Sequence, residues 1–484
     1  MNSIIGSLDN QPLCVDLDGT LIQSDLLLES TALLLRDKPW IAFAFPLWVL
    51  QGRAALKRRI ADRVELSADT LPYNSEVVEW LREEKAKGRR LILATASEIH
   101  LASAVADHVG LFDQVVASDG VLNLKGHKKL DALQARYGAD FDYAGDSSAD
   151  LPIWRTCREA ILVNPSSRTL RAARKTARVG RVFETPRRTG RLILRELRVY
   201  QWVKNLLIFI PLITSHQLGR LDLVYRGALG FAAFSLLASS VYIVNDVADL
   251  ESDRRHARKR LRPFASGNLS LKFAFALAPI LVIAAFAISA LLPPSATAVL
   301  GIYFAATLLY SLWLKRKLLV DVFMLAGLYT LRIVMGQASY GVELSTWLIS
   351  FSIFLFLSLG FCKRASELYN MRESGRTTNP RRGYHVNDLP QVNVFGVATG
   401  CLSSLVLAEY MNSDNVRILY KQPELLWLLS PLMLYWISRI WIVTYRGKMT
   451  EDPIIFAVKD RVTMMVALIF VVILFAATRN WFHL

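Results

Sequence analysis

The chain has 484 residues, of which 53% are hydrophobic, and its formal net charge is +16. That length exceeds what one domain usually needs, and that hydrophobic share predicts that part of the chain lies in lipid. In a membrane protein an excess of Lys and Arg reflects basic cytoplasmic loops, and these basic residues are not interleaved with aromatic ones, so nucleic-acid binding is not expected. The four cysteines lack paired spacing, which excludes a disulfide framework and a zinc signature and fits a reducing compartment.

Short apolar segments alternate with charged helical stretches over residues 1–185. The segments PLCVD, RRLILATAS, DQVVAS, FDYAGD and AILVNP are typical of strands, and stretches such as NSEVVEWLREEKAKG between them have helical periodicity. This alternation predicts an α/β domain with a doubly wound parallel sheet. The first twenty residues lack a basic segment followed by a long apolar run, so no secretory signal is expected.

Two further segments of this half concern the membrane surface. The apolar run WIAFAFPLWVL, residues 40–50, is too short to span a bilayer. It is either an apolar face of the N-terminal domain or a helix that rests on the bilayer. The basic connector SSRTLRAARKTARVGRVFETPRRTGRLILRELR indicates a linker and a helix at the membrane surface, with residues 186–203 joining a domain of residues 1–185 to one of residues 204–484.

From residue 204 onward nine apolar segments are long enough, or nearly so, to cross a bilayer. They centre on residues 205–220, 226–247, 271–292, 295–314, 319–340, 344–361, 390–410, 423–444 and 462–481. The first is the weakest, because Pro211 and His216 interrupt it. The basic loops fall on one side, which the positive-inside rule makes cytoplasmic. We therefore expect an all-α membrane domain of nine helices, a cytoplasmic N-terminal domain, and a bacterial inner membrane as the location.

Acidic and hydroxyl side chains follow the predicted strands at their carboxyl ends, where ligands bind in a doubly wound sheet. Asp16 and Asp18 follow the first strand in VDLDGTL, and Thr95 lies at the end of the strand in LILATAS. The segment YAGDSSAD supplies Asp146 and Asp150, which can complete a Mg²⁺ site with Asp16 and Asp18. The segment KGHKKLDAL adds three lysines that can balance anionic charge: Lys125, Lys128 and Lys129.

In this order the motifs resemble the haloacid dehalogenase superfamily of phosphatases, over about residues 10–165. The resemblance implies that Asp16 is the nucleophile that accepts the phosphoryl group and that Asp18 is the general acid and then the base. It implies that Thr95 and a lysine hold the transferring phosphoryl group and that Asp146 and Asp150 hold Mg²⁺. We favour Lys129 because it stands four residues before Leu133 in a helical pattern.

The stretch between the first two motifs is long enough for a helical cap that reads the substrate. The alternative to an active phosphatase is a degenerate domain kept as a scaffold, although no expected side chain is missing.

The most charged stretch of the membrane half is VYIVNDVADLESDRRHARKRLRPFASG, residues 241–267. Asn245, Asp249 and Asp253 are spaced four apart and form one stripe on a helix, with Asp246 beside it. Carboxylates on one face repel unless a cation lies among them, and Mg²⁺ bridges a few carboxylates to substrate phosphates. A plain basic cytoplasmic loop would explain the arginines that follow but not the carboxylates. Two of these arginines are candidates for binding the remaining phosphate charge: Arg258 and Arg262.

The pattern NDVADLESDRRHARKRLRPFASG resembles the first signature of the UbiA-type intramembrane prenyltransferase superfamily, whose nine helices surround a central polar cavity. The resemblance covers about residues 195–484. A second signature is expected between the fourth and fifth spans, where the chain has YSLWLKRKLLVDVFMLAGLYTLR. Asp321 and Arg332 are about three helical turns apart there, so we predict that they share a face. Lys315 and Arg316 lie at the entrance to this segment.

Departures from the pattern indicate a branch of that superfamily. The first helix lacks the Lys-Pro-Ile-Gly type motif of the aromatic prenyltransferases, and Asp321 is followed four residues later by Leu325 instead of a second aspartate. The segments QWVKN, LRPFASG and KRASEL are similar to the polyprenyl-phosphate phosphoribosyltransferase branch. Enzymes of that branch transfer 5-phosphoribose from 5-phosphoribosyl diphosphate to a polyprenyl phosphate.

That resemblance implies that the acidic and the basic residues bind different groups of the substrates. The carboxylate stripe with Mg²⁺ would bind the diphosphate, and basic side chains would bind the 5-phosphate and the lipid phosphate. The basic candidates are Lys204, Arg258, Arg262 and Lys363.

The combination of the two domains suggests a two-step enzyme. The transfer product still carries a 5-phosphate, and a phosphatase on the same chain could remove it to give polyprenyl-phosphoryl ribose, a precursor for arabinose-type cell-envelope sugars. One alternative is an aromatic prenyltransferase with an unrelated phosphatase domain. Another is a transporter or membrane scaffold, which the absence of a clear sequence repeat disfavours. Prenyl chain length and oligomeric state are left open.

Overall fold

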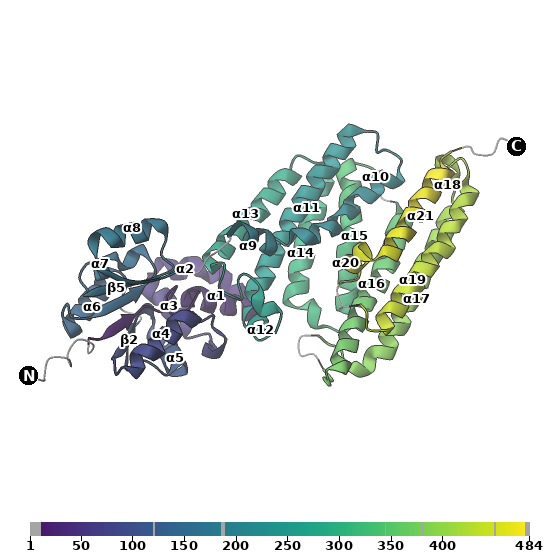
Figure 1. Ribbon diagram of the computed structural model, residues 1–484. Coiled ribbons are helices and arrows are strands. Elements are labelled where there is room, and N and C mark those ends of the chain that lie inside the picture. Colours follow the sequence, from purple (N-terminus) through teal and green to yellow (C-terminus); the bar gives the residue numbers. More distant parts are fainter. Residues whose placement is uncertain are drawn as a thin grey trace, which may run out of the picture. The chain divides into compact units, whose positions relative to one another are not determined.

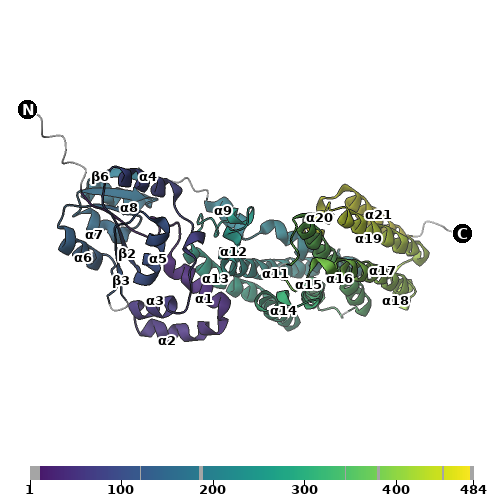
Figure 2. The same cartoon turned by 90° about the horizontal axis from the view of Figure 1, so that it is seen from below.

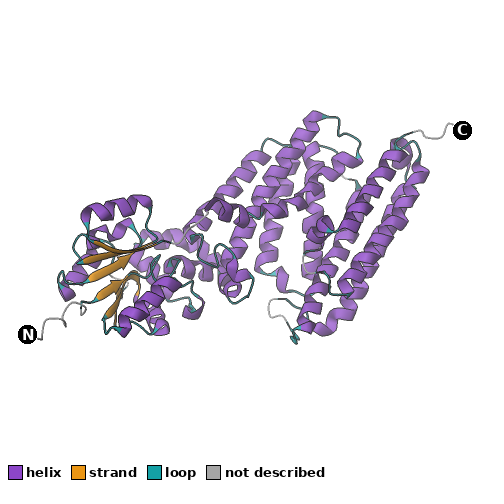
Figure 3. Cartoon of the chain, in the orientation of Figure 1, coloured by secondary structure: helices purple, strands orange, loops and turns teal. Residues whose placement is uncertain are grey.

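A computed structural model describes residues 11–119, 122–184, 189–343, 345–378, 382–449 and 452–479. The chain divides into two compact units. The first comprises residues Met1–Leu197 and Tyr242–Pro279, and the second comprises Arg198–Val241 and Ile280–Leu484. Among the described residues, the named strands all lie in the N-terminal part of the first unit, and the regular structure of the rest is helical (Figure 3).

The N-terminal domain is built on a six-stranded parallel sheet with the order β3-β2-β1-β4-β5-β6. The strands are β1 (Leu13–Val15), β2 (Leu91–Glu98), β3 (Gln114–Ser118), β4 (Asp142–Gly145), β5 (Glu159–Val163) and β6 (Val179–Phe183). The strand order reverses between β1 and β4, so the ligand-binding crevice of a doubly wound sheet lies at their carboxyl ends. The predicted doubly wound domain is confirmed.

The sheet is covered by helices on both faces because its strands are apolar on both sides. Leu13 and Val15 of β1 belong to one hydrophobic core, and Cys14 between them belongs to another, as the period of two in a strand requires. Figure 1 shows one group of helices on either side of the sheet. Helices α4 (Ser75–Ala86) and α5 (Ile99–Val109) pack into the first core, and α6 (His127–Tyr137), α7 (Leu151–Trp154) and α8 (Ser167–Thr176) pack into the second.

Part of the basic connector belongs to the sheet domain, although its many basic residues are typical of a linker. Its first part forms α8 and then β6, which pairs with β5 and buries Phe183 in the core. Only α9 (Thr189–Glu196) remains of the predicted linker and surface helix. Helix α8 and strand β6 lie within the predicted domain of residues 1–185, and the abundant arginines of this segment are on their exposed sides.

The expected cap lies between β1 and β2. It consists of α1 (Leu26–Asp37), η1 (Pro39–Ala44), α2 (Phe45–Leu50), α3 (Arg53–Ala61) and η2 (Ala68–Thr70), and Figure 2 shows α1, α2 and α3 grouped together. Residues 40–50 form in part an apolar face of the N-terminal domain, and their contact with a bilayer stays a prediction. Trp48 packs with Leu34 and Ile60 in a small core, whereas other large apolar side chains of the run are exposed.

Seven helices are long and apolar enough to cross a membrane, or eight if one bent pair counts as a span, in the part of the chain that the structure describes. They are α11 (Leu221–Ala248), α13 (Leu271–Ser289), α14 (Pro294–Leu312), α15 (Val320–Tyr340), α16 (Thr346–Glu373), η7 with α17 (Val386–Met411) and η8 with α19 (Pro423–Tyr445). The bent pair is α20 (Pro453–Lys459) and α21 (Arg461–Ala477), at 80°.

The sequence therefore predicted the all-α membrane class correctly and slightly more spans than the described residues contain. The weakest predicted span, at residues 205–220, corresponds to a short apolar helix of η4 (Val199–Phe209) and α10 (Ile210–Thr214). It ends before His216, whose φ of 56° is incompatible with a continuing right-handed helix. The chain is a multi-pass membrane protein.

The first unit joins the N-terminal domain to the segment that carries the carboxylate stripe. Arg254 donates two hydrogen bonds to the Glu29 carboxylate on α1, at 3.0 Å and 2.6 Å, and both side chains are less than a tenth exposed. Glu251 accepts from Arg36 and from Ser67, both at 3.1 Å. Gly267, at a φ of +74°, lies so close to the cap that a Cβ there would meet Gln23 at 2.7 Å.

Removing the guanidinium of Arg254 should loosen this segment from the N-terminal domain. Arg254→Met leaves the buried Glu29 carboxylate without its partner, which costs about 3 kcal/mol. Amide hydrogen exchange of residues 250–270, followed by mass spectrometry, is therefore expected to speed up about a hundredfold. Arg255→Met is the matched control, because Arg255 is 58% exposed and its ion pairs are screened by water. Equal exchange in the two variants would contradict this account.

Candidate functional site

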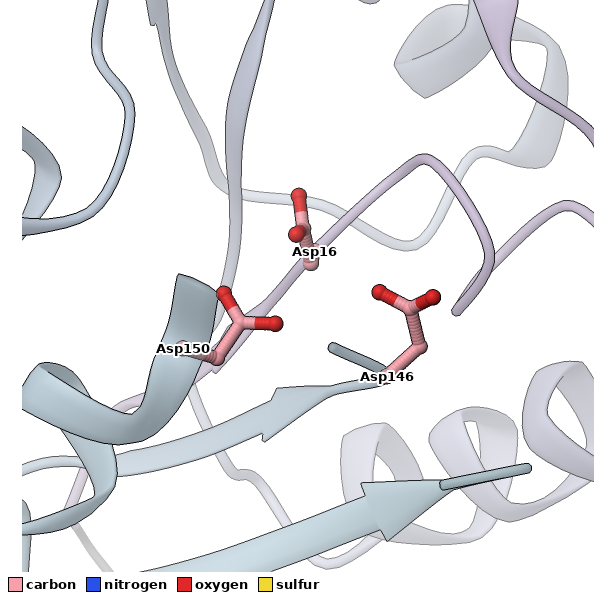
Figure 4. A group of neighbouring side chains, drawn as sticks. All are labelled: Asp16, Asp146 and Asp150. Carbon is pink, nitrogen blue, oxygen red and sulfur yellow. The ribbon is translucent and has the colours of Figure 1, made fainter. Parts of the chain in front are cut away.

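Three carboxylates converge at the carboxyl edge of the sheet. Asp16 follows β1, Asp146 follows β4, and Asp150 ends the turn η3 (Ser148–Asp150), and one oxygen of each lies within 4.8 Å of the others. Figure 4 shows the three carboxylates turned towards a common space. Gly19, at a φ of +78°, lets the chain pass beside them, since a Cβ there would meet the Asp146 carboxylate at 2.3 Å. Hard oxygen donors in this number fit Mg²⁺.

Burial and mutual repulsion raise the pKa values of this cluster. Burial raises the pKa of Asp16 to about 7, against the lowering effect of the Lys129 ammonium. Burial together with the charges of Asp16 and Asp150 raises the pKa of Asp146 to about 8. The site therefore has less positive charge than its carboxylates need, which a divalent cation would supply.

The other residues predicted for phosphate chemistry surround Asp16. The Lys129 ammonium lies 2.9 Å from Asp16 and donates a hydrogen bond to the hydroxyl of Tyr143 at 2.8 Å. Thr95 is fully buried and accepts from the Ser97 amide at 3.0 Å. Of the two lysines considered for this role, Lys129 is the one that reaches Asp16, and Lys125 lines the pocket around it.

Asp18 lies outside the group of three carboxylates, although the sequence analysis counted it as a possible metal ligand. Its carboxylate accepts from the Leu26 amide and from the Ser97 hydroxyl, each at 2.8 Å. Burial, reinforced by Asp25, raises the pKa of Asp18 to about 6. These contacts hold a carboxyl group that can exchange a proton near neutral pH next to Asp16, as a general acid and base requires.

The carboxylates open into a pocket of about 470 Å³ that three parts of the first unit build. The sheet domain supplies the acids. The cap supplies Lys57, whose ammonium donates to the Ala96 carbonyl at 2.6 Å and to Asn123 at 3.2 Å. The third part is the segment that follows the carboxylate stripe, which adds Gly267, Ser270 and Lys272.

The carboxylate stripe is nearly continuous with α11. The helix ends at Ala248, and α12 (Leu250–Arg254) follows, but the amides of Asp249 and Asp253 still bond to the carbonyls four residues earlier, at 2.9 Å and 2.8 Å. Arg262 donates to Asp246 at 2.8 Å and to Asp253 at 2.5 Å. Arg258 is exposed. The predicted stripe thus has one arginine bound across two of its acids.

A second polar cluster lies inside the second unit. Asp452 accepts from Lys204 at 2.8 Å and from Lys363 at 3.3 Å, and also from the hydroxyl of Tyr329 at 3.2 Å. Arg332 donates to the Asn205 amide oxygen at 2.9 Å and stacks against Tyr329, with 5.2 Å between the guanidinium carbon and the ring centroid. Two ammonium groups that share one carboxylate leave a net positive charge suited to a phosphate.

Asp321 and Arg332, both buried on α15, have different hydrogen-bond partners. Asp321 is fully buried, pairs with Arg364 at 2.8 Å and accepts from the Tyr384 hydroxyl at 2.7 Å. Through its ion pair with Arg364, the Asp321 carboxylate connects α15 to α16. Lys315 and Arg316 lie in the short turn η6 (Leu314–Arg316) before α15.

The sequence analysis missed Lys57, Lys272 and Asp452. Lys57 and Lys272 are single lysines in the cap and at the start of α13, and no spacing relates them to the acids they approach. Asp452 follows Glu451 in a short loop and belongs to no recognised motif. The position of Asp452 directly before a proline and an apolar helix was the one available signal, since such a residue caps the helix.

Comparisons with known proteins match both halves of the chain. A model of the UbiA prenyltransferase family matches residues 208–452, and one of haloacid dehalogenase-like hydrolases matches residues 13–155. The uncharacterized protein y4nM of Sinorhizobium fredii is 36% identical over 459 residues, which cover 94% of this chain and 89% of that protein.

Two further matches concern the membrane half. The decaprenyl-phosphate phosphoribosyltransferase of Mycobacterium tuberculosis is 33% identical over 187 residues, which cover 38% of this chain and 62% of that enzyme. The structure of a UbiA homolog from Archaeoglobus fulgidus bound to GPP and Mg²⁺ has 16% identity and a TM-score of 0.45, and covers 59% of this chain and 99% of that one.

Protons and Mg²⁺ should compete for the three carboxylates. Because the pKa values of Asp16 and Asp146 are raised to about 7 and about 8, both groups hold protons at pH 6 and release them by pH 8.5. Mg²⁺ binding, measured by titration calorimetry on the full chain, is therefore expected to be at least about a hundredfold weaker at pH 6 than at pH 8.5, because two protons must leave. The variant Asp146→Asn lacks one of the three carboxylates, so the part of the binding heat that disappears in this variant belongs to this site. An affinity that does not change between the two pH values would contradict the charge balance described above.

Proposed function

Because the chain belongs to the UbiA prenyltransferase family and carries a haloacid dehalogenase-like domain at its N-terminus, we propose that it catalyses two successive reactions on one lipid. The membrane domain transfers 5-phosphoribose from 5-phosphoribosyl diphosphate to a polyprenyl phosphate. The N-terminal domain then removes the 5-phosphate and leaves polyprenyl-phosphoryl ribose. The enzyme acts at the inner membrane of a bacterium, with its N-terminal domain in the cytoplasm.

In the transfer step an oxygen of the polyprenyl phosphate attacks the anomeric carbon of the donor. The bond from that carbon to the diphosphate oxygen breaks, and the diphosphate leaves with the electron pair. Mg²⁺ would neutralise the leaving diphosphate, with Asn245, Asp249 and Asp253 as the residues that hold it. Arg262, which already bridges Asp246 and Asp253, can turn to the same diphosphate.

Two features of the second unit support a donor with one diphosphate and separate phosphate groups. Asp321 of the second signature is buried in its pair with Arg364, so it does not offer a second diphosphate clamp. Lys204 and Lys363 converge on Asp452, and a phosphate that displaces this carboxylate gains two charge-assisted hydrogen bonds. The similarity to decaprenyl-phosphate phosphoribosyltransferases over 187 residues points to the same substrate class.

In the second step a carboxylate oxygen of Asp16 attacks the phosphorus of the 5-phosphate. The ester bond breaks, and Asp18 gives its proton to the departing ribose oxygen. Asp18 then takes a proton from a water molecule that attacks the aspartyl phosphate, which releases inorganic phosphate. Lys129 holds Asp16 in place at 2.9 Å and balances the charge of the transferring group. Mg²⁺ bound with Asp146 and Asp150 would supply further positive charge to the phosphate.

The observation that carries the coupling of the two steps is the composition of the pocket around Asp16. Gly267, Ser270 and Lys272 line it, and they follow the carboxylate stripe within the same compact unit. A lipid product released at the stripe therefore needs little diffusion to reach the phosphatase pocket, because both sites are on one chain at one membrane surface.

Loss of the central stripe carboxylate should abolish transfer. Asp249→Asn removes one negative charge from the proposed diphosphate site, and the rate of lipid labelling from radioactive 5-phosphoribosyl diphosphate and a short polyprenyl phosphate is expected to fall at least about a hundredfold. Asp222→Asn is the matched control, since Asp222 lies at the other end of α11 and is exposed. Undiminished labelling with Asp249→Asn would contradict the proposed donor site.

A further inference from the structure

The lysines of the pocket around Asp16 do not all have the same partners. Four lysines line it: Lys57, Lys125, Lys129 and Lys272. Lys129 is committed to Asp16, and Lys57 is held by Ala96 and Asn123. Lys272 differs from both, because its side chain is 72% exposed and it forms an ion pair with the partly exposed Asp25, at 3.2 Å. A pair of this kind yields readily to a phosphate, since exposed ion pairs are weak.

Lys272 also belongs to a different part of the chain from the other three lysines. It stands at the start of α13, a helix apolar enough to span the membrane, whereas the others belong to the sheet domain and its cap. The contacts that bring it to the pocket are built into the fold. Gly267 lies against Gln23, Arg254 is buried against Glu29, and the Lys272 ammonium reaches Asp25 at the beginning of α1.

We propose that Lys272 binds a second anionic group of the phosphatase substrate, so that the pocket selects sugar phosphates that carry another phosphate at the far end of the sugar. This inference rests on the proposed function, in which the ribose bears a 5-phosphate at one end and the lipid phosphodiester at the other. Asp16 attacks the first group while Lys272 holds the second at the end of the pocket that a membrane helix supplies. A pocket of about 470 Å³ has room for a pentose with two phosphates.

The test uses two soluble sugars that differ only in the second group. Ribose 1,5-bisphosphate has a phosphate where the lipid is attached, and ribose 5-phosphate lacks it. Release of inorganic phosphate from the 5-position is measured with the full chain, in detergent with Mg²⁺. For the wild type we expect KM to be about tenfold lower for the bisphosphate, the effect of one charge-assisted contact.

Lys272→Ala is expected to erase this difference in KM, because the second phosphate loses its ammonium partner. Lys272→Arg should restore the preference, which separates lost charge from lost folding. Lys175→Ala, on an exposed position of α8, should change neither KM value. A preference that survives Lys272→Ala and disappears in Lys125→Ala would overturn the assignment. Equal KM values for both sugars in the wild type would overturn the inference while the phosphatase activity stands, and no phosphate release from either sugar would overturn the phosphatase step itself.

A different surface of the first unit carries a second inference. On residues 39–50, four large apolar side chains repeat at intervals of three and four and are strongly exposed: Trp40 (59%), Phe43 (89%), Leu47 (59%) and Leu50 (83%). The opposite side packs through Trp48 against Leu34 and Ile60. Exposed basic residues flank the run, namely Lys38, Arg58 and Arg63, and Arg63 stacks over Trp48 at 5.2 Å.

We infer that this face of the cap inserts into the headgroup region of an anionic bilayer. An apolar helical face with basic flanks is complementary to such a surface, where apolar side chains enter the acyl boundary and cations meet lipid phosphates. The same compact unit contains the last residues of α11 and the first residues of α13. Both helices are apolar enough to cross a membrane, so the chain of this unit continues directly into predicted membrane spans. Insertion would keep the phosphatase pocket beside the lipid headgroups.

The depth of a nitroxide label tests this contact. The label is placed at Phe43→Cys in a Cys401→Ser background, because Cys401 is exposed and Cys14, Cys157 and Cys362 are buried. The full chain is reconstituted in vesicles of phosphatidylcholine and phosphatidylglycerol, with Lys175→Cys as the aqueous control. At position 43 we expect frequent collisions with oxygen and rare collisions with a water-soluble nickel chelate. Frequent collisions with nickel, as at position 175, or rare collisions with both, as in a protein interface, would overturn the inference.

Discussion

The buried ion pair between Glu29 and Arg254 connects two parts of the molecule that are more than two hundred residues apart. Glu29 belongs to the first helix of the cap, and Arg254 ends the short helix that carries the last acid of the stripe. Because both charges are withdrawn from water, the pair is tolerated only in the bidentate geometry that it has. That requirement fixes the segment after the stripe against the cap, and with it the position of Lys272 in the phosphatase pocket.

The sequence was most informative where chemistry depends on local pattern. Parallel strands end at one edge, so Asp16, Asp146 and Asp150 could be assigned to a common site before the structure was known, and they lie together. The apolar runs predicted a helical membrane domain for the same reason, since length and hydropathy are local properties. Spacing by four along a helix likewise anticipated the carboxylate stripe.

What the sequence could not provide depends on contacts between distant segments. Lys57 and Lys272 reach the pocket from the cap and from a membrane helix, and neither stands in a motif. Asp321 was expected to meet a substrate, but Arg364 and Tyr384 from the following elements enclose it. The sixth strand was not predicted, because exposed arginines in and beside it interrupt the alternation of apolar and polar residues that is typical of a strand. In each case a tertiary neighbour decides the role of the residue.

The arrangement explains why a phosphatase would be joined to a membrane transferase. A phosphorylated sugar attached to a lipid cannot leave the membrane surface, so the enzyme that dephosphorylates it must work there. The first unit would meet this need, because the pocket around Asp16 is partly built from the start of α13. Under the proposal for Lys272, the positive charge of that wall would favour a substrate with two anionic groups over dissolved monophosphates.

The central claim is that both sites act in sequence on one lipid. It is tested most directly by incubating the full chain with Mg²⁺, 5-phosphoribosyl diphosphate and a short polyprenyl phosphate, and by identifying the lipid products by mass spectrometry for the wild type and for Asp16→Asn. The account predicts polyprenyl-phosphoryl ribose from the wild type and its 5-phosphorylated form from Asp16→Asn. The same lipid from both proteins, or consumption of a prenyl diphosphate with an aromatic acceptor instead, would contradict it.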